Sequence, residues 1–171
     1  MEVTSGAALF FPILYFLDTS GWFAALLPAV LCHELGHWFA VRYCGGTVLS
    51  VRLDVTGICM DISPMHRTWE DVLCAGAGPF AGLCWVPLAL CIGGDWGEKS
   101  AVSALIINCF NLLPALPLDG GKILLALTGS RGLLLCTSLL TAGSLIFISV
   151  YMRLWGILIP AGLIARTALT A

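Results

Sequence analysis

The sequence predicts an all-α polytopic membrane protein with about six transmembrane helices and one small membrane-associated β-hairpin. Hydrophobic residues make up 59% of the 171 residues and charged residues only 11%, against roughly 25% charged residues in an ordinary soluble domain. Six apolar windows follow one another, and a short stretch between the second and third alternates in polarity. Because so little charge is available to solvate a surface, we expect the apolar side chains to face lipid.

The six apolar windows define the predicted spans. They cover residues 5–17, 22–43, 69–92, 100–116, 132–150 and 154–169. The first and last are short for a hydrocarbon core about 30 Å thick. Since no internal repeat or linker interrupts the pattern, we expect residues 1–171 to form a single intramembrane domain.

The basic residues predict an orientation. With the N-terminus in the cytoplasm, six of the eight basic residues fall inside and two outside, as the positive-inside rule requires. The six are Arg42, Arg52, Arg67, Lys122, Arg131 and Arg166, and the two are Lys99 and Arg153. We therefore expect both termini to be cytoplasmic.

The net charge of −2 and the scattered basic residues exclude a basic patch, so we expect no nucleic-acid partner.

A β-hairpin is predicted between the second and third windows. Apolar and polar residues alternate over residues 49–55, and Gly57 separates this run from Ile58, Met60 and Ile62. Such alternation is typical of paired strands. An unpaired strand edge cannot face lipid, so the hairpin should lie at the membrane interface or in a water-accessible groove. Its edge either pairs with another extended strand or only plugs the groove.

Small residues are concentrated in the third window, at Gly76, Ala77, Gly78, Pro79 and Gly82. This spacing allows another helix to approach closely. Helix packing alone explains the pattern, and a role in shaping a substrate groove is the alternative.

The second window contains His33-Glu34-Leu35-Gly36-His37. On a helix the two histidines lie one turn apart on the same face, so both imidazoles can reach one zinc ion, with Glu34 beside the metal's open position. The structural alternative is a set of polar residues satisfied within a helix bundle. Each of these ionisable groups costs about 2 kcal/mol or more to insert into a membrane, and nothing structural requires them there.

Catalytic zinc usually has three protein ligands, so a third is needed. His66 lies in a charged loop and is more typical of an ordinary loop residue. Asp119 follows a segment with Pro114 and Pro117, which must interrupt the fourth apolar helix. Free backbone at membrane depth is tolerated only where it lines a cavity or is buried against protein, so the break indicates a site. The predicted topology places His37 and Asp119 in the same half of the membrane.

The two motifs together, H-E-x-x-H in one apolar helix and N-x-x-P-x-x-P-L-D-G-G after a later one, resemble the site-2 protease family of intramembrane metalloproteases across most of the chain. The resemblance implies that His33, His37 and Asp119 bind one zinc ion per chain. It also implies that Glu34 is the catalytic base and that Asn111 helps to hold the substrate backbone.

The G-P-x-x-G pattern at residues 78–82 and the hairpin resemble the same family. Members often carry an appended PDZ or CBS domain, and we expect neither here. The compact form is most similar to the sporulation branch, which processes a membrane-associated pro-sigma factor. The resemblance implies an integral protein of a bacterial cell membrane that hydrolyses transmembrane or membrane-associated protein substrates. Membrane lipid and a regulatory membrane protein are further expected partners.

A different functional class stays open: a non-catalytic zinc-binding membrane scaffold or a zinc transporter. Either would use the same His and Asp residues. Neither needs Glu34 beside His33 at a free coordination position. The substitution Glu34→Gln therefore discriminates between the classes.

Overall fold

The computed structural model describes residues 2–54 and 57–170 of the chain, and most of them are helical. The helices are α1 (Ser5–Leu17), α2 (Trp22–Tyr43), α3 (Thr68–Ile92), α4 (Gly94–Asn111), α5 (Asp119–Thr128), α6 (Arg131–Met152) and α7 (Leu158–Thr170), with a 3-10 turn, η1 (Trp155–Ile157), before α7. The strands are β1 (Glu2–Val3), β2 (Val48–Asp54) and β3 (Gly57–Ile62). The predicted class, mainly helical with a small sheet, is confirmed.

Three helices in the described part of the chain, α2, α3 and α6, are long and apolar enough to cross a membrane. The predicted number of about six spans is not confirmed. Helices α1 and α7 have 13 residues each, or about 20 Å at 1.5 Å per residue, and the hydrocarbon core is about 30 Å thick. Helix α4 has 18 residues but carries Asp95, Glu98 and Lys99 near its start.

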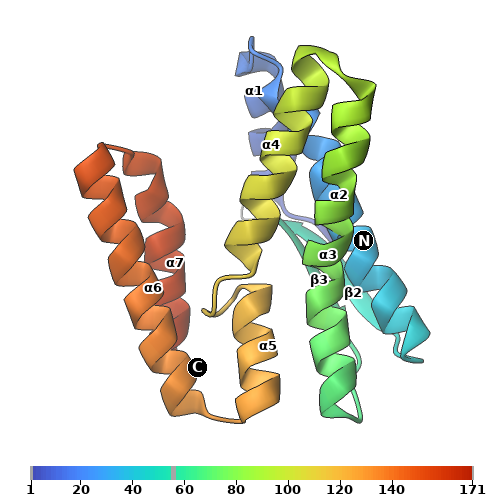
Figure 1. Ribbon diagram of the computed structural model, residues 1–171, viewed down its shortest axis with the longest axis vertical. Coiled ribbons are helices and arrows are strands. Elements are labelled where there is room, and N and C mark those ends of the chain that lie inside the picture. The colour runs from blue at the N-terminus through green and yellow to red at the C-terminus, as the bar shows by residue number, and fades with distance from the viewer. Residues whose placement is uncertain (1, 55–56, 171) are drawn as a thin grey trace.

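Small side chains fill the interior, and large apolar side chains point outward. Ala25, Ala29 and Ala104 are fully buried, whereas Phe39 and Ile106 are more than half exposed. Such an arrangement is typical of helices that pack in lipid, where small residues allow close backbone approach. Helices α2, α3 and α4 pack side by side in this way (Figure 1).

The α1–α2 and α3–α4 turns meet at one end of the molecule. The Lys99 ammonium donates a hydrogen bond to the Ser20 carbonyl at 2.7 Å and pairs with Asp95 on its own helix. Helices α6 and α7 form a separate antiparallel pair beside α4 and α5 (Figure 1).

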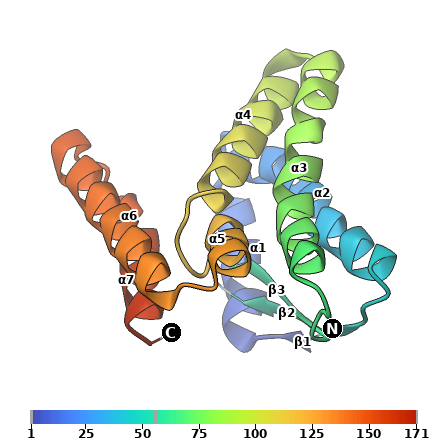
Figure 2. The same ribbon diagram turned by 60° about the horizontal axis from the view of Figure 1, so that its bottom comes forward.

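The predicted hairpin is confirmed: β2 and β3 pair antiparallel with Val51 opposite Met60. Val55, which the prediction included, lies outside the described residues. The sheet has a third strand that the polarity pattern did not predict, because β1 pairs parallel with β2, Val3 opposite Leu53. Figure 2 shows the sheet near the N-terminus, beside α1 and the first turns of α3. Strand β2 is therefore the central strand, with β3 along one edge and β1 on the other edge at Arg52 and Leu53.

Candidate metal centre

The two histidines project from one face of α2, because residues four apart lie one turn apart on a helix. His33 is buried and His37 is partly buried. Between them, Gly36 allows α3 to approach: a Cβ at position 36 would lie 2.4 Å from the Ala77 carbonyl oxygen. Close packing of α2 on α3 thus encloses both imidazoles.

The third side chain reaches the same place from a break in the helical path. Helix α4 ends at Asn111, the segment 112–118 is irregular, and α5 begins at Asp119. The two glycines that follow Asp119 have no room for side chains: a Cβ at Gly120 would lie 2.2 Å from the Leu112 carbonyl oxygen, and one at Gly121 would lie 2.4 Å from the Ala115 carbonyl carbon. The start of α5 therefore packs tightly on the irregular segment, and the buried Asp119 faces α2.

Three potential ligand atoms converge. His33 Nε2 lies 3.1 Å from His37 Nε2, and the Asp119 Oδ2 atom lies 3.3 Å and 3.2 Å from these two nitrogens. Each Nδ1 has its own acceptor, since His33 Nδ1 is 2.8 Å from Asn108 Oδ1 and His37 Nδ1 is 2.7 Å from the Cys74 carbonyl oxygen. A neutral imidazole with hydrogen on Nδ1 has a lone pair on Nε2. In these tautomers, three lone pairs face one another.

A bound cation would relieve this repulsion, and the donor set suits zinc. Two imidazole nitrogens and one carboxylate oxygen are a usual ligand set for catalytic zinc. At bond lengths of about 2.0–2.1 Å, tetrahedral geometry separates ligand atoms by about 3.3–3.4 Å, close to the separations seen here. Among the described residues, His33, His37 and Asp119 are the group of His, Cys, Asp and Glu side chains that could hold a metal ion.

The other residues singled out from the sequence lie in different places. Glu34 is partly buried beside the histidines and within electrostatic range of Asp119 and Lys122. Asn111 is half-buried at the last position of α4. His66 is exposed, and its backbone N–H donates to Glu70. The structure therefore brings Asp119, and not His66, to the two histidines.

Two residues beside the centre were missed in the sequence. Asn108 is fully buried and contacts His33, and Lys122 pairs with Asp119 Oδ1 at 2.8 Å. Lys122 follows the D-G-G motif, so its position three residues after Asp119 was an available signal. For Asn108 the available signal was an amide within an apolar helix, where polar groups need partners.

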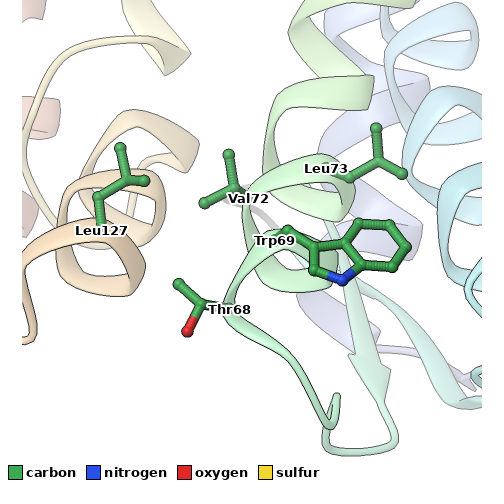
Figure 3. Close-up of a pocket in the computed structure, with 5 residues that line it drawn as sticks. All are labelled: Thr68, Trp69, Val72, Leu73 and Leu127. Atoms are coloured by element: carbon green, nitrogen blue, oxygen red, sulfur yellow. The ribbon is translucent and has the colours of Figure 1, made fainter.

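A separate cavity of about 620 Å³ lies between the start of α3 and the end of α5 (Figure 3). Its lining residues are Thr68, Trp69, Val72, Leu73 and Leu127. None of them is ionisable, so this cavity supplies no acid, base or charged ligand.

Comparison with known proteins finds relatives whose names describe zinc metalloproteases, although no protein-family model matches the chain. "Putative zinc metalloprotease Rip3" of Mycobacterium tuberculosis is 31% identical over 127 residues, which cover 67% of this chain and 32% of that protein. "Putative zinc metalloprotease sll0528" of Synechocystis sp. is 34% identical over 110 residues, covering 58% of this chain and 29% of that protein. The chain thus spans about a third of the length of these relatives.

The solved structure of the site-2 protease from Methanocaldococcus jannaschii matches the fold with a TM-score of 0.73 at 18% identity. The match covers 95% of this chain and 84% of that one. Most of the helical arrangement is therefore shared. The chain has the site-2 protease fold, and the resemblance to that family predicted from its two motifs is confirmed.

Proposed function

We propose that this chain is an intramembrane zinc metalloprotease that hydrolyses peptide bonds of transmembrane or membrane-associated proteins. The observation that carries the proposal is the convergence of His33 Nε2, His37 Nε2 and Asp119 Oδ2 within 3.3 Å of one another, with Glu34 adjacent. The fold and the zinc metalloprotease names of the relatives support it. These three residues would hold one zinc ion per chain.

Bound zinc would polarise a peptide carbonyl and lower the pKa of water. The residues of the chain do the remaining work. Glu34, next to His33 on α2, takes a proton from the attacking water and returns it to the leaving amine. Asn111 donates a hydrogen bond to the substrate backbone or to the developing oxyanion.

A transmembrane substrate must unwind before cleavage, because its peptide groups are engaged in helical hydrogen bonds. Helix-weakening residues should therefore mark cleavage sites. The bacterial membrane location, the cytoplasmic termini and a regulatory membrane protein partner remain part of the proposal. So does a pro-sigma factor as substrate, in line with the sporulation branch.

The test compares cell membranes containing the wild-type chain with membranes containing Glu34→Gln. Glu98→Gln is the matched control, because it makes the same chemical change at an exposed position of α4. We expect new protein N-termini, detected by mass spectrometry, with the wild type and with Glu98→Gln but not with Glu34→Gln. All three proteins should contain about one zinc ion.

The outcome also separates the proposal from the other functional classes. A binding scaffold would produce no new N-termini in any sample. A transporter would show changed zinc flux in Glu34→Gln and no new N-termini. Equal cleavage by the wild type and Glu34→Gln would remove Glu34 from the mechanism.

A further inference from the structure

We infer that Asn108, which lies outside both sequence motifs, is a positioning residue that holds His33 with its Nε2 atom free to bind metal. The inference rests on the proposed function, since it concerns the same metal ion. Asn108 is in the last turn of α4 and is fully buried. It contacts α2 through the His33 ring and its own helix through the Ala104 carbonyl.

The hydrogen bonds determine which way the amide faces. The Ala104 carbonyl oxygen can only accept, and it lies 2.7 Å from Asn108 Nδ2, so the NH₂ group must face it. The amide oxygen then faces His33 Nδ1 at 2.8 Å. Because this oxygen can only accept, Nδ1 carries the hydrogen, and the lone pair of the neutral ring is on Nε2. One backbone carbonyl of α4 thus selects the tautomer of a metal ligand on α2.

The amide is also confined sterically. A Cβ at Gly82 would lie 2.2 Å from Asn108 Oδ1 and 2.3 Å from Nδ2, so this face of α3 is in direct contact with the amide. Gly78, one turn earlier on the same face, contacts the His37 ring in the same way. The two glycines of the G-P-x-x-G pattern therefore support both histidines. Gly78 contacts His37 directly, and Gly82 acts on His33 through Asn108.

These contacts assign to α3 a function beyond helix packing. A hydrogen-bond partner on the non-coordinating nitrogen of a ligand histidine commonly changes metal affinity by about 10–100-fold when it is removed. Asn108 is such a partner, and Gly82 is what gives it room.

The experiment uses the full chain purified in detergent, and its probes are Zn²⁺ and Co²⁺ alone. Zn²⁺ affinity is measured by competition with a chromophoric chelator, and the Co²⁺ ligand-field spectrum reports the geometry of the donors. We expect Asn108→Ala to weaken Zn²⁺ binding by about 10–100-fold and to shift the Co²⁺ spectrum. Asn108→Asp keeps an acceptor oxygen for His33 Nδ1 but loses the N–H that donates to the Ala104 carbonyl, so it should restore part of the affinity.

A pair of glycine substitutions tests the same inference without altering the amide. Gly82→Ala should displace Asn108 and weaken Zn²⁺ binding, whereas Gly76→Ala should not, because its Cβ would meet only Ile123 Cδ1 at 3.8 Å. Thermal melts of the metal-free proteins identify variants that fail to fold. If Asn108→Ala fails to fold, Gly82→Ala and Asn108→Asp decide.

The measurements distinguish failure of this inference from failure of the proposed function. Wild-type affinity and an unchanged Co²⁺ spectrum in folded Asn108→Ala would overturn the positioning role alone. Equal loss of affinity in Asn108→Ala and Asn108→Asp, with Gly82→Ala unaffected, would likewise overturn it. A wild-type chain that binds neither metal would overturn both.

Discussion

Gly78 lies directly against the imidazole of His37, so that a Cβ at position 78 would fall 2.2 Å from Nε2. No side chain fits there unless the ring moves. We predict that Gly78→Ala displaces this ligand atom and weakens Zn²⁺ binding by about 10–100-fold, as expected when a ligand loses its orientation. Chelator competition measures the change. Gly76→Ala, on the same helix, is the control, because a Cβ there would make only an ordinary van der Waals contact with Ile123 Cδ1 at 3.8 Å. Equal affinities in the two variants would contradict the prediction.

The ligand set makes a second prediction. His33→Ala, His37→Ala and Asp119→Ala should each lose most of the zinc, because catalytic zinc usually needs three protein ligands. His66→Ala should retain it, since His66 is exposed and its backbone contacts Glu70 rather than the cluster. Metal analysis of the purified variants is the measurement. Normal zinc content in Asp119→Ala together with loss of zinc in His66→Ala would show that the third ligand is His66 and not Asp119.

Lys122 should matter less than the buried partners of the centre. Its ammonium pairs with Asp119 Oδ1 at 2.8 Å, but its side chain is 56% exposed, and exposed ion pairs contribute about 0–1 kcal/mol. We therefore predict that Lys122→Met weakens Zn²⁺ binding by less than about 5-fold, a smaller effect than that of Asn108→Ala. Added salt should reduce the difference further. A loss as large as that of a ligand variant would instead make Lys122 essential for orienting Asp119.

Asn111 is predicted to act on the substrate and not on the metal. If its amide holds the substrate or the oxyanion, Asn111→Ala should slow cleavage by about 10²-fold, a typical loss for one such donor, with zinc content unchanged. The structural alternative is that Asn111 satisfies backbone groups freed by the helix break. One freed group, the Leu116 N–H, already donates to Ser138 Oγ. Activity normalised to folded, zinc-loaded protein separates the two, because the structural role predicts normal specific activity.

The orientation in the membrane can be tested by thiol labelling in a background lacking the eight native cysteines. We predict that a reagent confined to the outside labels Asp95→Cys but not Arg42→Cys, because the basic residues favour a cytoplasmic C-terminal end of α2. Both positions are exposed. The reverse labelling pattern would show that the predicted orientation is wrong and that His37 lies nearer the outer surface.

Local features of the fold could be read from the sequence because they depend on neighbours along the chain. Helical geometry alone places His33 and His37 on one face of α2. Pro114 and Pro117 disfavour a continuous helix, and α4 stops at Asn111 before α5 begins at Asp119. Alternating polarity likewise predicted the β2–β3 pair. The number of membrane-spanning helices was harder to predict from the sequence, because six apolar windows do not show which of the helices are long enough to cross a bilayer.

Contacts between distant segments were decided only by the tertiary structure. Asp119 is 82 positions from His37. It lies beside the two histidines, unlike His66, because α5 packs on the irregular segment. Asn108 and Asn111 lie on nearly the same side of α4, about 4.5 Å apart along its axis, so the sequence alone could not tell which one reaches the depth of His33. The packing of α4 on α2 and α3 sets that depth. The physical reason is that residue spacing determines direction around a helix, whereas the height of one helix against another depends on where small residues such as Gly82 allow close approach.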